Sequence, residues 1–202
     1  IFGNLKKSKG EILIHGEKVT IKNPIQAMKH GIGFVTEDRK TEGLVLDFSI
    51  KENMFLTNLK SIAKGSFIQA QQEQLQATKY IEQLNIRCSD ATQSVGSLSG
   101  GNQQKVVIAK WLSTKPDILI LDEPTRGVDI GAKKEIYSIM NKLAEEGVAI
   151  LMISSELPEV LGMADRVMIM NEGRQTAILD NIDLTQETIM HYATGGEEVV
   201  KN

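Results

Sequence analysis

The sequence lacks several features that would quickly place it in a class of protein. Cys88 is the single cysteine among 202 residues, so no internal disulfide can form. We therefore expect a reducing compartment and an inert thiol. No apolar run approaches the ~20 residues that a membrane-spanning helix needs, and no signal peptide is visible. The formal net charge of −3 argues against a nucleic-acid-binding protein, which usually carries a basic stripe.

A phosphate-binding loop of the usual kind is also missing. The pattern G-x-x-x-x-G-K-[ST] needs a lysine directly after a glycine, and none of the 17 glycines is followed by lysine. The first residue is Ile1 rather than methionine, so we expect the chain to be cut from a longer one. Its length suggests one large domain, or a domain with a sub-domain, that buries roughly 70% of its unfolded surface.

The hydrophobic pattern predicts an α/β fold. Strands that are apolar on both faces alternate with helices, which favours a mostly parallel sheet covered by helices. We expect one domain over 1–196 with a helical sub-domain over about 45–100, and a frayed tail over 197–202. The expected elements are a β-hairpin (10–21), a short helix (23–31), a buried strand (32–36), an exposed loop entering a helix (37–54), a helix with a narrow apolar stripe at Ile68, Leu75, Ile81 and Leu84 (67–86), an amphipathic helix (102–112), a buried strand (117–121), a helix (131–147), a second buried strand (148–154), a short helix, a closing hairpin and a last helix (185–192).

Two acidic residues follow one of the buried strands. Four apolar residues, Ile118 to Leu121, run directly into Asp122 and Glu123. Ligands bind at the carboxyl ends of strands in open α/β sheets. Asp122 can hold Mg²⁺ there, directly or through water, and Glu123 can orient or deprotonate an attacking water. The alternative is an acidic strand end that merely caps the next turn.

A hydroxyl and two glycines precede the helix predicted over 102–112. The Ser99 hydroxyl and the N–H groups of Gly100 and Gly101 can point at an anion, assisted by the helix dipole. Glycine lets a phosphate approach the backbone closely. By itself, this stretch fits a plain N-terminal helical turn equally well.

The order of these motifs is more specific than either motif alone. The stretch LSGG, a helix, an apolar strand ending in Asp-Glu, and then EPTRGVD resembles the ATP-binding cassette (ABC) ATPases, over residues from the start to about Gly195. The resemblance makes Leu98–Lys105 the signature motif, with Asn102 where glutamine is commoner. It implies that Asp122 is the Walker B aspartate, Glu123 the catalytic glutamate and Asp129 the D-loop aspartate.

Four strings, TEDRKTEGL, EPTRGVDIGAK, ISSELPEV and MNEGR, resemble the second half of carbohydrate-uptake ATPases of the ribose/galactose type. In that family one polypeptide carries two ABC halves, and the second typically has a degenerate P-loop. The opening residues are similar to the segment after the P-loop helix, so the P-loop and the aromatic residue that stacks on adenine are expected upstream of Ile1. The fold implied is therefore a P-loop NTPase-like ABC domain without its P-loop segment.

Two positions depart from the general ABC pattern. Glu37 stands where the lid-loop glutamine is expected, and Ser155 stands where the switch histidine is expected. A carboxylate at position 37 can still ligate Mg²⁺, but it adds negative charge beside a phosphate. Serine is too short to replace an imidazole at the γ-phosphate. Both departures agree with a weakened nucleotide site in this half.

The resemblance implies a function that one half cannot perform alone. In ABC dimers each nucleotide lies between the P-loop of one half and LSGG of the other, so Ser99, Gly100, Gly101 and Asn102 are expected at the ATP of the partner half. The implied cofactors are ATP and Mg²⁺. The implied partners are an N-terminal ABC half, transmembrane permease subunits contacted by the 38–47 loop and, indirectly, a sugar-binding protein, at the cytoplasmic face of the cell membrane.

Two other classes of protein compete with this interpretation. The chain could be a non-catalytic, ABC-like interaction module that binds a partner and no nucleotide, which the missing P-loop favours. It could also belong to the ABC-type chromosome or DNA-repair ATPases. Those carry very long coiled coils before LSGG, whereas this chain has room only for a compact helical stretch, so we disfavour that class.

Overall fold

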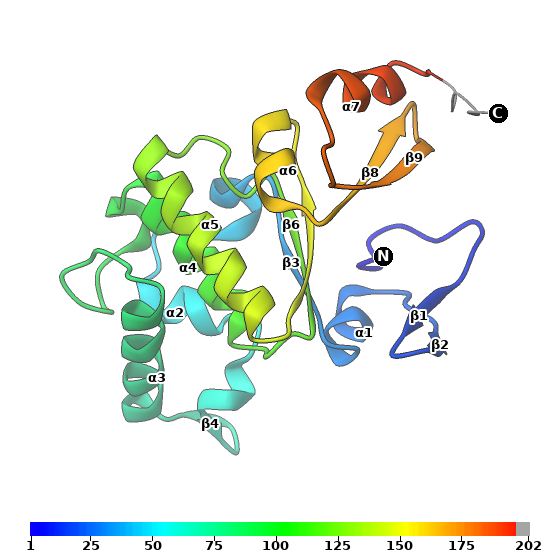
Figure 1. The fold of residues 1–202 in the computed structure, drawn as a ribbon. Coiled ribbons are helices and arrows are strands. Elements are labelled where there is room, and N and C mark those ends of the chain that lie inside the picture. Colours follow the sequence, from blue (N-terminus) through cyan, green and yellow to red (C-terminus); the bar gives the residue numbers. More distant parts are fainter. Residues whose placement is uncertain (197–202) are drawn as a thin grey trace. The chain divides into compact units, whose positions relative to one another are not determined.

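The computed structural model describes residues 1–196 (Figure 1). The predicted tail over 197–202 lies outside the described residues. The chain forms two compact units, Ile1–Ile153 and Ser154–Asn202. The bounds expected for the helical sub-domain, about 45–100, remain a prediction.

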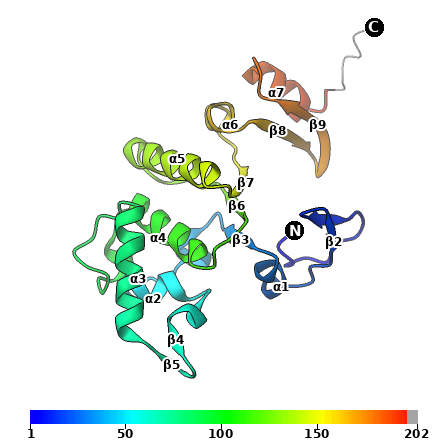
Figure 2. The same cartoon turned by 60° about the horizontal axis from the view of Figure 1, so that its bottom comes forward.

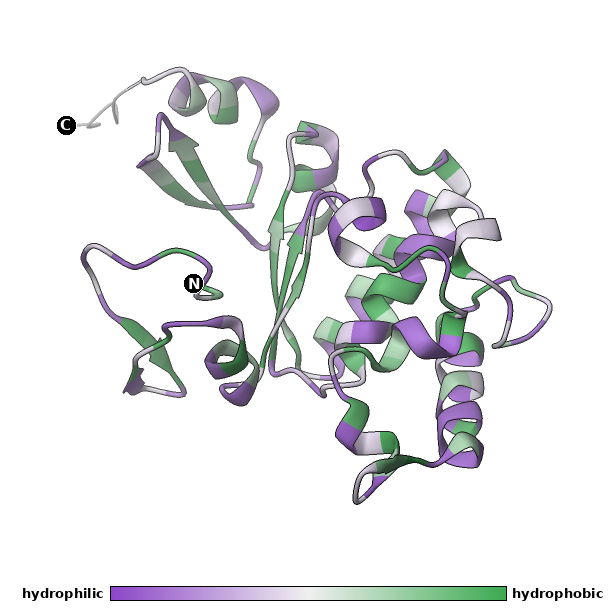
Figure 3. Ribbon diagram, turned by 180° about the vertical axis from the view of Figure 1, so that it is seen from behind, coloured by the Kyte–Doolittle hydropathy of each residue, from purple (hydrophilic) through white to green (hydrophobic). Residues whose placement is uncertain are grey.

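A parallel three-stranded sheet organises the first unit. Its order is β3 (Ile32–Val35), β6 (Ile118–Asp122), β7 (Ala149–Ile153). Register places Val35 beside Leu121, and Asp122 beside Ile153. Figure 3 shows these strands as hydrophobic along most of their length. The expected parallel sheet is confirmed, and β6 ends at the acidic pair.

The two faces of the sheet are covered by different elements. Side chains on one face, including Val35, Leu119 and Leu121, are fully buried. Two helices, α4 (Gly100–Leu112) and α5 (Ile130–Glu145), pack against this side. On the other face, β3 and β6 pack against α1 (Pro24–Lys29) and the hairpin of β1 (Ile12–Ile14) and β2 (Glu17–Val19). The hairpin and the short helix, capped by Asn23, form where the sequence predicted them.

The strand β7 differs from its prediction as a fully buried strand. Leu151 is 36% exposed and Ile153 is 47% exposed. Both lie on the face shared with Ile120, because Leu151 is its register partner and side chains alternate along a strand. The cluster built by α1 and the hairpin contains residues of β3 and β6 but none of β7. That prediction was wrong because β7 lies at the edge of the sheet, beyond this cover.

The helix α4 also differs from its prediction. It begins at Gly100 rather than at Asn102, and nearly all its residues are buried, including Lys105 and Lys110. The reason is its position: β3, α5, α2 (Ile50–Phe55) and the π-helical turn η1 (Arg39–Gly43) all pack against it. The expected amphipathic pattern fails because, beyond the first turn, no side of this helix is left to the solvent.

The region before α4 is mainly helical, and Figure 2 shows α3 (Ala70–Gln83) beside α2. The predicted helix start at Phe67 was wrong, because Phe67 and Ile68 instead form β5 (Phe67–Ile68), which pairs with β4 (Ala63–Lys64). The predicted apolar stripe was also wrong in part. Leu75 is half exposed, whereas Glu73 is buried because it pairs with Lys51 of α2 at 2.9 Å. Two short turns, η2 (Leu59–Ile62) and η3 (Val95–Ser97), complete the region.

The second unit has its own small core. It contains α6 (Leu157–Met163), an antiparallel hairpin of β8 (Arg166–Asn171) and β9 (Arg174–Asp180), and α7 (Gln186–Ala193). The core consists of Val167, Ile169, Ala177 and Ile189. The closing hairpin and the last helix are as predicted. Within residues 1–196, no helix combines the length and the apolar character needed to cross a membrane.

Candidate functional site

Asp122 lies at the carboxyl end of β6 in a crowded, negatively charged environment. Burial raises the pKa of its carboxyl group, and the neighbouring carboxylates of Glu123 and Glu42 raise it further. Glu42 belongs to η1, so a loop distant in sequence brings a third carboxylate to this strand end. Sequence reasoning missed Glu42, because nothing in the local pattern shows that η1 folds back toward β6.

Glu123 has an unusual backbone conformation. Its φ is 47°, in the left-handed region that side chains rarely adopt. Such a residue costs of order 1–3 kcal/mol and persists only where its surroundings enforce it. Here the Glu123 N–H donates to the carbonyl of Ile153 at 2.9 Å, and the Arg126 N–H donates to the carbonyl of Glu123 at 3.1 Å. The strand end is therefore held rigidly in a strained turn, as residues in active sites often are.

The acidic end of β6 can bind Mg²⁺ only together with ligands from outside the chain. Within residues 1–196, no three or more His, Cys, Asp or Glu side chains are grouped so that they could hold a metal ion. Mg²⁺ in nucleotide sites is typically bound by one or two carboxylates together with phosphate oxygens and water. The mutual repulsion of Asp122, Glu123 and Glu42 favours a nearby cation. This donor set fits the ion when a nucleotide supplies the remaining oxygens.

Ser99 stands at the start of α4 with its hydroxyl exposed. It is the N-cap residue, yet in the described chain its side chain accepts no capping hydrogen bond from a main-chain N–H of the first turn. Its Oγ instead accepts from Asn102 Nδ2 at 3.0 Å, and Asn102 Oδ1 accepts from the Arg87 N–H at 2.9 Å. The first N–H groups of a helix have no partners within the helix. The hydroxyl and these amides together can bind an anion.

The two glycines of this turn leave room for contacts inside the chain. A Cβ at Gly101 would lie 2.4 Å from Cβ of Ala132 in α5. A Cβ at Gly100 would lie 2.7 Å from Nη2 of Arg39 and 3.1 Å from the carbonyl oxygen of Gly127. The sequence argument explained both glycines by a phosphate. The structure adds an independent reason, which is the close approach of α5 and of the Arg39 side chain.

Arg39 connects three parts of the site. Its Nη1 donates to the carbonyl of Arg126 at 2.7 Å, and its Nη2 donates to the carbonyl of Gly127 at 3.1 Å. It therefore joins η1 to the turn that follows Glu123, beside Gly100. Sequence analysis placed Arg39 in the exposed loop expected to contact the permease but did not predict these contacts. Because its acceptors are main-chain carbonyls nearly ninety positions away, no sequence signal could have revealed the contact.

Two predicted site carboxylates have partners within the chain. Glu37 forms an ion pair with Arg126. Asp129 caps α5, because its Oδ1 accepts from the Ala132 N–H at 2.9 Å. Their predicted roles beside a nucleotide stay predictions. Ser155 is an exposed residue of the second unit, and its predicted place at the γ-phosphate also stays a prediction.

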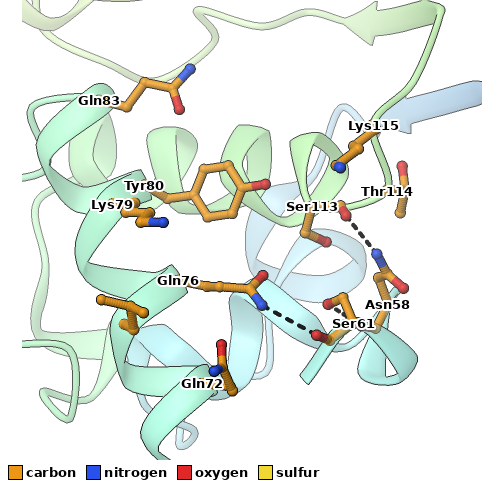
Figure 4. A pocket seen from close by; sticks show the side chains of 11 residues that line it. Asn58, Ser61, Gln72, Gln76, Lys79, Tyr80, Gln83, Ser113, Thr114 and Lys115 are labelled. Atoms are coloured by element: carbon orange, nitrogen blue, oxygen red, sulfur yellow. Dashed lines mark hydrogen bonds between the residues drawn. The ribbon is translucent and has the colours of Figure 1, made fainter. Parts of the chain in front are cut away.

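A polar pocket lies elsewhere, between α3 and the end of α4 (Figure 4). Its volume is about 650 Å³. Gln76 donates to the carbonyl of Ser61 and Tyr80 donates to that of Leu112, so these groups serve to join the elements. The pocket shares no residue with the site around Asp122. Its lining residues are Asn58, Ser61, Gln72, Leu75, Gln76, Lys79, Tyr80, Gln83, Ser113, Thr114 and Lys115.

Comparison with known proteins identifies close sequence relatives. Residues 1–126 match the family described as ABC transporter. The chain is 59% identical over 197 residues to a ribose import ATP-binding protein RbsA of Bacillus cereus, a match that covers 98% of this chain and 40% of that protein. It is 57% identical over 196 residues to the protein of that name from Geobacillus kaustophilus, covering 97% and 40%. The chain spans about 40% of the length of the curated relatives it matches.

Solved structures with the same fold are more distant in sequence. A nucleotide-free ATP-binding cassette from an ABC transporter superposes with a TM-score of 0.77 and 23% identity, covering 96% of this chain and 77% of the other. The ATP-binding cassette MJ0796, in a dimeric post-hydrolysis state bound to ADP and Pi, gives a TM-score of 0.70 and 21% identity, covering 88% and 75%. The predicted fold class is confirmed by these likenesses.

Proposed function

Since this chain belongs to the ABC transporter family, we propose that it is part of the second nucleotide-binding half of a carbohydrate importer. In this proposal the parent protein couples ATP binding and hydrolysis to sugar uptake. It works at the cytoplasmic face of the cell membrane with permease subunits and, indirectly, a sugar-binding protein. The names of its relatives, ribose import ATP-binding proteins, support this class of substrate.

The exposed Ser99 hydroxyl at the start of α4 is the observation that carries the proposal. Asn102 Nδ2 donates a hydrogen bond to the Ser99 hydroxyl oxygen at 3.0 Å. The main-chain N–H groups of the first turn of the 13-residue helix follow directly in the chain. Such an arrangement favours a phosphate. In the assembled parent, Ser99, Gly100 and Gly101 would hold the γ-phosphate of ATP whose other phosphates lie in the P-loop of the N-terminal half.

The acidic end of β6 would serve the second nucleotide site of the parent. Asp122 would hold Mg²⁺, which neutralises charge on the phosphates. Glu123 would orient and deprotonate the attacking water. Glu37 would lie at the lid-loop position and Ser155 at the switch position, while Asp129 would belong to the D-loop between the halves. The pairing of Glu37 with Arg126 supports a weak contribution from this second site.

A specific observation also favours the alternative, a non-catalytic ABC-like interaction module. Several predicted site residues already have structural roles: Glu37 pairs with Arg126, Asp129 caps α5, and Gly101 makes room for Ala132. A fold that needs these residues for packing could keep them without binding a nucleotide. Equilibrium binding of ATP to the full-length parent separates the two functions.

Sugar uptake by the assembled transporter tests the proposal. Vesicles containing the full-length protein and its permease, with the sugar-binding protein outside, should take up ribose or galactose only when ATP is supplied inside. Ser99→Arg should abolish uptake, because a long cation would occupy the place of the γ-phosphate. Ser97→Arg is the control, since Ser97 is exposed in the same segment but ends η3, where its hydroxyl bonds to Gln93 and to the carbonyl of Ser94 instead of standing at the start of α4. Equal uptake by both variants would rule out the proposed role of Ser99.

A further inference from the structure

The Arg39 side chain lies at the junction of three segments. It starts in η1, within the exposed 38–47 loop. Its two terminal nitrogens donate to the successive carbonyls of Arg126 and Gly127. The place that a Cβ at Gly100 would take lies 2.7 Å from Nη2. The guanidinium therefore fills the space between η1, the turn after Glu123 and the first residue of α4.

This arrangement is specific for arginine. Two parallel N–H groups contact two successive carbonyls, which the planar fork of a guanidinium can do and the single ammonium of lysine cannot. Gly127 has φ of +66°, a conformation that glycine adopts without strain. Burial lowers the pKa of Arg39, and its buried Nε has no hydrogen-bond partner within residues 1–196. The two carbonyls, together with the charge of Asp38, therefore hold this cation in place.

The base of the side chain is rigid as well. Asp38 Oδ1 accepts from the Lys40 N–H at 2.9 Å and from the Thr41 N–H at 3.2 Å. These bonds fix the first turn of η1, and the Gly43 carbonyl at its end accepts from the buried ammonium of Lys110. The turn η1 is therefore capped at its start by Asp38 and joined to α4 at its end. If the exposed loop is displaced, Arg39 should therefore move together with η1 as one rigid turn.

We propose that Arg39 is a positioning residue that transmits displacement of the 38–47 loop to the start of α4. The same side chain transmits it to the turn at Arg126 and Gly127, which lies between Glu123 and Asp129. This inference rests on the proposed function, because the loop is proposed to contact the permease. The position of the permease would then determine, through the Arg39 guanidinium, the geometry of the anion-binding turn at the start of α4. It would also determine the geometry of the turn that follows Asp122 and Glu123.

Hydrogen exchange in the full-length protein tests this directly. Exchange is measured with and without the permease, in peptides covering 37–43, 98–103 and 125–129. In the unmodified protein the permease should slow exchange in all three. In Arg39→Lys the loop peptide should remain protected, whereas the permease-induced change in the two remote peptides should fall about fivefold or more, the lower range of ordinary allosteric coupling. Lys40→Ala is the matched control, because Lys40 is exposed in the same turn.

The outcomes distinguish this inference from the proposed function. If the permease protects all three peptides equally in Arg39→Lys and in the unmodified protein, Arg39 does not transmit the signal, while permease contact at the loop stands. If the permease protects none of them in the unmodified protein, contact at the loop is wrong and the inference fails with it. A purely structural role would instead change exchange in the remote peptides without the permease and leave the permease-induced difference intact.

A second pair of variants covers the case in which Arg39→Lys folds poorly. A methyl group at Gly100 must displace the guanidinium, because the two would be 2.7 Å apart. Gly100→Ala should therefore reproduce the remote exchange defect of Arg39→Ala, and the double variant should be no worse than either single variant. Additive defects would show that Gly100 and Arg39 act separately, which would overturn the inference.

Discussion

The Lys105 ammonium group, on α4, donates to the Glu135 carboxylate of α5 at 2.6 Å. Lys105 is only 1% exposed, and its second acceptor is the carbonyl of Asn85 at 2.6 Å. Glu135 also pairs with Arg87 at 2.8 Å, the residue whose N–H is held by Asn102. The pair thus links the helix that begins at Ser99 both to α5 and to the segment after α3.

Glu135→Gln should destabilise the chain by about 2 kcal/mol, because it leaves the charge of a buried lysine without its counter-ion. The loss is smaller than for a fully buried pair, since a third of the Glu135 side chain is exposed. Urea unfolding followed by circular dichroism measures the change. Glu145→Gln is the control, because Glu145 is exposed on the same helix. Equal unfolding midpoints for the two variants would contradict the prediction.

Lys110 should make stability increase with pH above neutrality. Burial lowers the pKa of this lysine from 10.5 to about 8, so the unfolded chain binds more protons than the folded chain between these values. The free energy of unfolding should therefore rise from about pH 8 to about pH 10.5, by up to about 3 kcal/mol from this group. The rise should be absent in Lys110→Met, and the difference between the two curves isolates the lysine. Parallel curves would show that Lys110 is not responsible.

The chain by itself should not hydrolyse ATP and should bind it weakly at best. Its sequence has no glycine followed by lysine, so it lacks the lysine and the backbone nest that cradle the α- and β-phosphates. A phosphate-release assay with the purified chain and Mg²⁺ measures turnover, with Glu123→Gln as the control for contaminating enzymes. Clear turnover that disappears in Glu123→Gln would refute this prediction.

Substitutions of Ser99 and of Glu123 should lower the ATPase rate of the full-length transporter by different amounts. In the proposed function, Ser99→Arg should block closure over the site of the partner half, which the resemblance implies is intact. Loss of a preorganised charge-stabilising group commonly costs ~10²–10³-fold in rate, and we expect at least that. Glu123→Gln alters a site in which Glu37 and Ser155 are proposed to take the lid-loop and switch positions, so we expect a modest decrease.

Steady-state ATPase rates of both variants, measured side by side with the permease present, test this asymmetry. If Glu123→Gln abolishes turnover while Ser99→Arg stays near the unmodified rate, the roles of the two half-sites are reversed. A nearly equal loss in both variants would show instead that the two nucleotide sites work as one.

Much of the fold could be predicted from local patterns. The hairpin, α1, β6 and α7 form where short-range signals placed them, since turn residues, caps and apolar runs act within a few positions. The errors at α3, α4 and β7 have a common origin. Burial there depends on which distant element packs against each face: Glu73 is buried because Lys51 reaches it, and Leu151 is exposed because nothing in the cluster around α1 extends over it.

The candidate site could be predicted only where its residues are neighbours in sequence. Asp122 and Glu123 were found because they follow one apolar strand, and Ser99 was found because it precedes one helix. The contacts of Glu42 and Arg39 were missed because they join segments about eighty to ninety residues apart. Arg39 also belongs to a loop expected to be simply exposed, whereas its guanidinium is half-buried against main-chain carbonyls.

The edge position of β7 has a practical consequence for anyone who purifies this chain. Among the described residues the strand pairs only with β6, and Leu151 and Ile153 are exposed on one of its faces. A sheet edge with exposed apolar residues is a template on which another strand can add, and proteins usually protect such edges with charges, bulges or a covering segment. Self-association and aggregation of the chain are therefore expected to begin at this strand, so the yield of soluble material should depend on how that edge is shielded.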